Sequence, residues 1–124
     1  QLWKFHRLFW RYNVVLYNIE VKDNEEIYFT TTDGQRFLMY HQQDCCESVT
    51  VEEIIGDLED LIGSPILLAE EVVEEGENDC WGTSTWTFYK LATVKGSVTI
   101  RWYGASNGYY SESVDFVLLK NGIE

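Results

Sequence analysis

The chain has few basic residues, a single proline and no long apolar run. Nine lysines and arginines stand against 21 aspartates and glutamates, so the net charge is −12 at pH 7. Because the phosphate backbone supplies most non-specific affinity for DNA and RNA, an acidic body is not expected to bind nucleic acid directly. A protein partner with a basic surface is expected instead. The apolar stretches are far shorter than the ~20 residues that cross a bilayer, so no membrane span is predicted.

Cysteine is also scarce. The chain has three, Cys45, Cys46 and Cys80, and two of them are adjacent. An odd number leaves one thiol over in any pairing, and neighbouring cysteines rarely pair with each other. We therefore expect three reduced thiols in a cytosol, not the disulfide framework of a secreted protein.

The length of 124 residues suits a single domain spanning 1–124. Residues 1–12 differ from the rest, because they mix aromatic residues with Lys4, Arg7 and Arg11 and contain no acid. This segment carries +3 and leaves −15 on residues 13–124. A basic aromatic segment can lie on a membrane surface or dock on a partner. Ordinary packing against the core ranks first among its interpretations.

Alternation of apolar and polar residues predicts β-strands along most of the chain. Asp33-Gly34 is the signature of a two-residue type I′ hairpin turn, and Lys95-Gly96 marks a second hairpin. Val98, Ile100 and Trp102 fall on one face of their strand. The predicted strands are 14–21, 27–32, 35–41, 66–73, 81–93, 97–103 and 113–119.

One amphipathic helix is predicted at about 51–62. Thr50 and Glu53 have the spacing of a capping box, and apolar residues from Val51 to Ile62 recur at intervals of three and four. Gly63 would end this helix. The predicted fold class is therefore α+β: a mainly antiparallel sheet of about six or seven strands with this helix packed on one face.

The segment 41–47 concentrates the residue types that carry chemistry. It forms a candidate functional loop with His41, Gln43, Asp44, Cys45, Cys46 and Glu47. A zinc ion held by His41, Cys45, Cys46 and Cys80 is one hypothesis, although no Cys-x-x-Cys pair is present. A cysteine nucleophile activated by His41 is another, but the flanking carboxylates oppose thiolate formation. A structural role as a buried, hydrogen-bonded loop ranks above both. We assign no catalytic residue and expect no cofactor.

A candidate interaction surface combines aromatic residues with acids. Aromatic residues among small polar neighbours are common in protein-recognition surfaces. The acidic run could imitate a phosphate array, or it could be a solvated edge that prevents aggregation. The candidate residues are Trp102, Tyr103, Asn107, Tyr109, Tyr110, Glu74, Glu75 and Glu77.

Four sequence blocks together resemble a family of small uncharacterised proteins from tailed-bacteriophage genomes. The blocks are HQQDCCE (41–47), GDLEDLIGSPILLAEE (56–71), TWTFYKLAT (85–93) and IRWYG (100–104) with SNGYYSE (106–112). The resemblance implies a phage accessory protein acting in the bacterial host cytoplasm, and it supplies no activity. We therefore favour a small acidic protein that binds a host or phage protein, as in host takeover or anti-defence inhibition. The alternatives are a metal-binding or thiol-dependent enzyme centred on 41–47, or a minor virion component.

Overall fold

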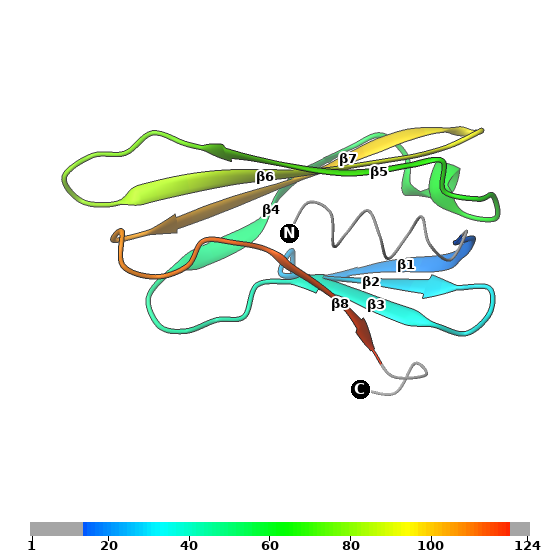
Figure 1. Cartoon of the computed structure of the whole chain (residues 1–124), viewed down its shortest axis with the longest axis horizontal. Coiled ribbons are helices and arrows are strands. Elements are labelled where there is room, and N and C mark those ends of the chain that lie inside the picture. Colours follow the sequence, from blue (N-terminus) through cyan, green and yellow to red (C-terminus); the bar gives the residue numbers. More distant parts are fainter. Residues whose placement is uncertain (1–13, 120–124) are drawn as a thin grey trace.

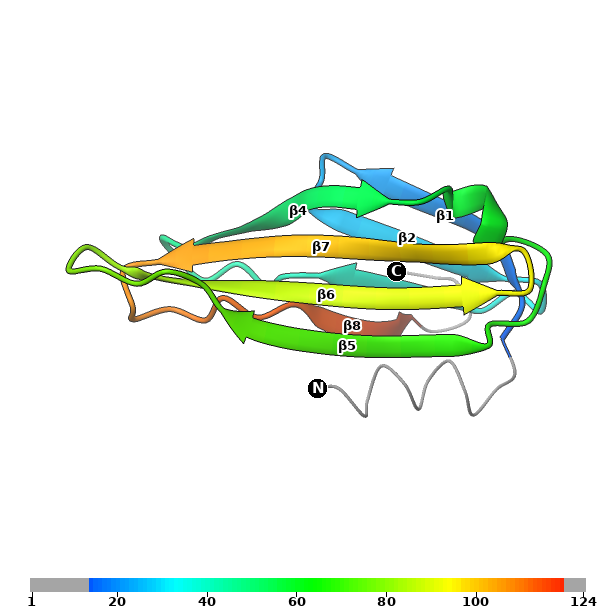
Figure 2. The ribbon, with the colours of Figure 1, turned by 90° about the horizontal axis from the view of Figure 1, so that it is seen from above.

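Two antiparallel four-stranded sheets pack face to face in the computed structural model, which describes residues 14–119 (Figures 1 and 2). The predictions made for residues 1–12 lie outside these residues. The first sheet has the order β1-β2-β3-β8 and the second β4-β7-β6-β5. The elements are β1 (Leu16–Lys22), β2 (Glu26–Thr31), β3 (Arg36–Tyr40), β4 (Ser48–Ile55), the short 3-10 helix η1 (Leu58–Leu61), β5 (Leu68–Glu75), β6 (Thr83–Thr93), β7 (Gly96–Ser106) and β8 (Asp115–Leu119).

The core fills the space between the two sheets. Phe37 stacks on Phe116 from the neighbouring strand, with ring centroids 5.4 Å apart, and Phe29 meets the edge of the same ring. Across the sheets, the Trp102 indole N–H donates to the Met39 sulfur at 3.3 Å. These side chains are almost completely buried, and burial of each large apolar side chain contributes roughly 1.5–3 kcal/mol.

The predicted α+β class is wrong, because the structure described here is almost entirely β. Residues 48–55 form β4, which pairs with β7, and η1 at Leu58–Leu61 is the helical part of the segment predicted as a helix. A β-bulge between Val51 and Glu53 adds one residue to the strand, so the inward side chains fall at Val49, Val51 and Ile54. The three-residue step from Val51 to Ile54 therefore imitates helical spacing.

Gly56 ends this strand in a backbone conformation that a helix does not contain. Its φ is +110°, and a Cβ built on it would lie 2.6 Å from the Ser97 carbonyl oxygen of β7. The neighbouring strand β7 therefore lies too close to leave room for a side chain at this position. Asp57, not Thr50, caps the helical turn that follows, because its carboxylate accepts the Glu59 backbone N–H at 3.0 Å.

The hairpin turns differ in detail from the prediction. Asp23 and Asn24 both have positive φ, and the Glu25 N–H donates to the Lys22 carbonyl at 2.9 Å, which is the geometry of a type I′ turn. At the β2–β3 turn only Gly34 has positive φ, so the type I′ turn predicted for Asp33-Gly34 is wrong.

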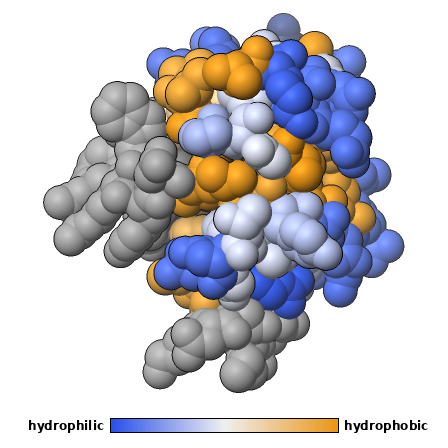
Figure 3. All heavy atoms as spheres, turned by 90° about the vertical axis from the view of Figure 1, so that its right-hand side faces the viewer, coloured by the Kyte–Doolittle hydropathy of each residue, from blue (hydrophilic) through white to orange (hydrophobic). Residues whose placement is uncertain are grey.

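The two ends of the sandwich are built differently. At one end, Leu16 of β1 makes a bridge with Ile62, and Val15 just before β1 makes one with Pro65; these bridges tie the two sheets together beside η1. Viewed from this end, hydrophobic residues reach the surface between hydrophilic rims (Figure 3). The other end, called the loop end below, consists of residues 41–47, 76–82 and 107–114 (Figure 1). Within residues 14–119, no helix has the length and apolar character needed to span a membrane.

Candidate functional site

His41 and Glu47 form a buried ion pair where the chain passes from β3 to β4. The His41 Nε2 atom lies 2.6 Å from Glu47 Oε2, and its Nδ1 atom lies 2.7 Å from the Ser113 carbonyl oxygen. Both side chains are almost fully buried. Since each ring nitrogen already faces an oxygen acceptor, neither is free to take a proton from a substrate or a thiol.

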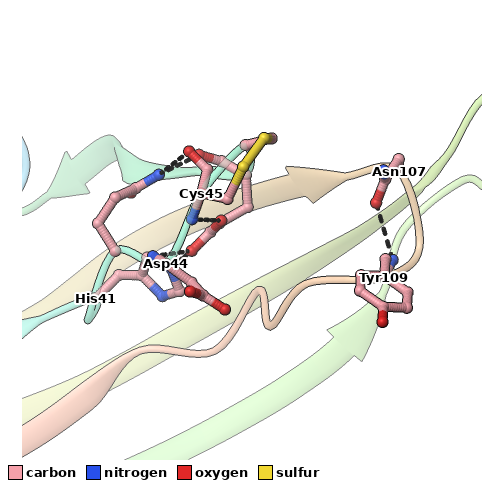
Figure 4. Close-up of a disulfide and its surroundings, with 8 residues drawn as sticks. His41, Asp44, Cys45, Asn107 and Tyr109 are labelled. Atoms are coloured by element: carbon pink, nitrogen blue, oxygen red, sulfur yellow. Dashed lines mark hydrogen bonds and ion pairs between the residues drawn. A yellow bond between two sulfur atoms is a disulfide. The ribbon is translucent and has the colours of Figure 1, made fainter.

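The Glu47 carboxylate also organises the loop backbone. It accepts the Asp44 N–H at 2.8 Å and the Cys45 N–H at 3.0 Å, while the Gln43 amide donates to the Glu47 carbonyl at 2.7 Å (Figure 4). The hydrogen bond from His41 is the main cause that lowers the pKa of Glu47 to about 2, with the backbone donors assisting against desolvation. The carboxylate is therefore ionised and saturated with donors across the neutral pH range.

The cysteines do not follow the prediction of three free thiols. Cys45 and Cys46 are joined by a disulfide, because their adjacent side chains meet in the tight bend between β3 and β4. Cys80 is free and exposed, and it lies in the loop between β5 and β6. A disulfide leaves no thiolate for zinc at Cys45 or Cys46. Within residues 14–119 no group of three or more histidines, cysteines or acids could hold a metal ion.

The functional groups of His41 and Glu47 in the loop 41–47 are thus hydrogen-bonded to each other and to the backbone. These hydrogen bonds connect β3 and β4 to the segment before β8. Residues 42–46 are exposed, so the loop is hydrogen-bonded but not buried as the structural interpretation expected. A polar hollow of about 460 Å³ lies beside it, between the start of β2 and the start of β4. The residues lining this hollow include Glu25, Glu26, His41, Gln43 and Thr50.

Trp102 does not belong to the interaction surface proposed from the sequence. Its side chain is fully buried in the core, where it contacts Met39. Tyr103 points to the opposite face of β7, and its ring centroid lies 4.5 Å from that of Trp86. Glu74, Glu75 and Glu77 are exposed, as a binding surface requires.

Two nearly fully exposed aromatic rings stand on adjacent loops of the loop end. Tyr109 is 83% exposed and Trp81 is 84% exposed. Both are held by short backbone turns: the Asn107 side chain accepts the Tyr109 N–H at 3.0 Å, and the Asp79 side chain accepts the Trp81 N–H at 2.8 Å (Figure 4 for Tyr109). Tyr110 packs edge-on against Tyr109 at 5.3 Å. Sequence reasoning placed Trp81 in a strand and missed its exposure.

Glu112 fastens the loop that carries Tyr109 to β6 and β7. Its carboxylate accepts hydrogen bonds from the hydroxyls of Thr85 at 2.7 Å, Ser106 at 2.6 Å and Thr83 at 2.5 Å. Burial alone would raise the pKa of Glu112, but these hydroxyl donors outweigh it and lower the pKa. The sequence analysis had not singled out Glu112, and only the cross-strand register places its donors around it.

A second buried carboxylate, Glu71, lies on the inner face of β5. The Tyr89 hydroxyl donates to it at 2.9 Å. Desolvation raises the pKa of Glu71 more than this hydrogen bond lowers it, and burial beside Glu71 also raises the pKa of Tyr89. Glu71 lines a hollow together with Thr85 and Glu112.

Comparison with protein families gives one match, which covers most of the chain. Residues 6–116 match the model of a family described as Domain of unknown function (DUF7448). The chain belongs to this family. Comparison with curated proteins and with solved structures finds no match at a significant level. Membership of the family therefore carries no activity, and function has to be argued from the site itself.

Proposed function

We propose that this protein works by binding a basic surface of another protein through its loop end, without catalysing a reaction. The observation that carries the proposal is the pair of exposed rings, Trp81 and Tyr109, on two neighbouring loops, of which the second is fastened to β6 and β7 through Glu112. Exposed aromatic side chains that cluster on a monomer are the usual anchors of protein recognition. Because their backbones are fixed by turns, little entropy would be lost when a partner binds.

The charge around these rings supports a basic partner. Glu75, Glu77 and Asp79 are exposed on the chain that leads to Trp81, and the net charge of the whole chain is −12. Such a field draws in basic surfaces and repels nucleic acid. A thiol-dependent or metal-dependent reaction at 41–47 is less well supported, because His41 and Glu47 are fully engaged with each other and with the backbone.

We further propose, from the sequence resemblance alone, that the protein is a tailed-phage accessory protein of the bacterial host cytoplasm. An inhibitor of a host or anti-phage defence protein is the concrete form of this proposal. A role as a minor virion component is its alternative, and detection of the protein in purified particles by mass spectrometry would favour that alternative.

Affinity purification from infected cells tests the binding proposal when it is done with matched variants. A partner that binds the parent protein should be lost with Trp81→Ala and Tyr109→Ala. It should be retained with Tyr17→Ala, which removes another exposed aromatic ring from β1 in the other sheet. Equal recovery with all three variants would reject the loop end as the binding surface.

A further inference from the structure

A groove of about 490 Å³ lies on the outer face of the β4-β7-β6-β5 sheet, apart from the loop-end aromatic pair. It is lined by Glu52, Glu77, Ser84, Trp86 and Tyr103. The rings of Trp86 and Tyr103 lie 4.5 Å apart and are inclined at 52°. Both are only partly buried, while Glu52 and Glu77 are exposed. Aromatic faces attract cations electrostatically, and the carboxylates add charge of the sign that a cation requires.

The same sheet already contains one example of this recognition. The Arg101 guanidinium lies 5.1 Å from the centre of the Trp86 ring, and one of its nitrogens contacts Glu53 Oε1 at 2.7 Å. An arginine over Trp86 with a carboxylate at its side is therefore compatible with the local geometry. The groove offers Trp86, Tyr103 and two further carboxylates in the same neighbourhood.

Arg101 is the basic side chain of the described residues that lies at the groove, and its ion pair is with Glu53. Between residues 14 and 119, neither Glu52 nor Glu77 has an ion-pair partner. The other basic residues between 14 and 119 lie elsewhere: Lys22 and Arg36 have their side chains over the Tyr28 ring, Lys95 donates to the Ile62 carbonyl, and Lys90 of β6 is the register partner of Glu70.

We propose that this groove binds one basic side chain, an arginine or a lysine, of the partner protein. A guanidinium would stack on the indole and reach the carboxylates, whereas an ammonium would act as a point charge over the rings. The proposal deepens the proposed function and rests on it for the existence of a basic partner. The chemistry of the groove can be tested without that partner.

The direct test is an NMR titration of the full chain with capped tripeptides. The indole N–H signal of Trp86 is assigned by its loss in Trp86→Phe. Gly-Arg-Gly and Gly-Lys-Gly should shift this signal saturably, and added salt should weaken the effect. Gly-citrulline-Gly, which is nearly isosteric with the arginine peptide but neutral, should shift it far less. The indole signal of Trp102, which is buried in the core and donates to Met39, is the internal control and should stay in place.

Exposed charge variants test the groove without disturbing the core. Glu52→Gln and Glu77→Gln should each weaken peptide binding by roughly 1.5- to 5-fold, the range of single exposed charge pairs. Glu20→Gln, an exposed acid on β1, is the matched control and should change nothing. Binding of the citrulline peptide as tightly as the arginine peptide, or unchanged affinity in both groove variants, would overturn the proposal.

Four further outcomes are also decisive. A Trp86 signal that fails to shift with either basic peptide would exclude the site. A signal that moves with protein concentration before any peptide is added would assign the groove to a second copy of the chain. If the peptides bind but no partner is lost from Trp81→Ala and Tyr109→Ala, the loop-end function fails while the groove remains. If the partner is lost from Trp81→Ala and Tyr109→Ala but the peptides do not bind, the groove proposal fails while the loop-end function remains.

Discussion

Gly56→Ala distinguishes the observed strand from the helix that the sequence predicted, because the substitution should destabilise the first and stabilise the second. In the middle of a helix, replacing glycine with alanine would stabilise the protein by about 1 kcal/mol. Here Gly56 has φ +110° and a new Cβ would lie 2.6 Å from the Ser97 carbonyl oxygen and 3.2 Å from the Val98 Cα. The backbone conformation costs about 1–3 kcal/mol for a residue with a side chain. The contact adds about 1–3 kcal/mol, since backbone atoms cannot rotate away.

The expected loss in the free energy of unfolding is therefore about 2–6 kcal/mol, summed from these two contributions. Urea unfolding followed by circular dichroism measures it. Gly63→Ala is the matched control, because Gly63 has φ +86° but nothing within 4 Å of a new Cβ, so it should show the conformational cost alone. A Gly56→Ala protein as stable as the parent, or no less stable than Gly63→Ala, would refute the reasoning.

Three other predictions concern buried groups. Leu61→Ala should lower the free energy of unfolding by about 2–5 kcal/mol in urea melts, because this side chain of η1 is fully buried; a loss under 1 kcal/mol would contradict the packing. The lowered pKa of Glu47 adds stability above pH 4.5 that is lost as the pH falls toward 2. In urea melts at a series of pH values, Glu47→Gln should therefore lose less stability than the parent on the acid side. Parallel stability profiles for the two proteins would count against this. Glu71 has a raised pKa, so its ionisation costs stability as the pH rises above 4.5. The amide oxygen of Glu71→Gln can still accept from Tyr89, so the free energy of unfolding of this variant should increase relative to that of the parent as the pH rises. A difference between the two proteins that stays constant with pH would contradict this.

Most of the strands could be predicted from the sequence, and the structural reason for the exception is specific. Alternation located the hairpin of β6 and β7 closely, because both strands have regular apolar inner faces. Alternation failed at β4, where the bulge at Val51 and Glu53 shifts the pattern by one residue. A bulge is a property of strand pairing, so a single strand's sequence does not display it.

The candidate site was predictable in location but not in its contacts. The cluster 41–47 could be singled out from the sequence, yet the pairing of His41 with Glu47 depends on how the loop bends, and the Ser113 contact depends on the approach of β8. Burial of Trp102 follows from the predicted inner face shared with Ile100, so its assignment to a surface conflicted with that pattern. Exposure of Trp81 could have been suspected from the turn residues that flank it.

The most direct test of a basic partner at the loop end is surface plasmon resonance with a purified partner over a salt series. We expect association to slow as salt rises, and charge reversal of Glu74, Glu75 and Glu77 to lower mainly the association rate. Tyr109→Ala should instead raise the dissociation rate, because the ring is a contact and not a steering charge. Association that does not depend on salt, or full binding by the triple charge reversal, would contradict the account.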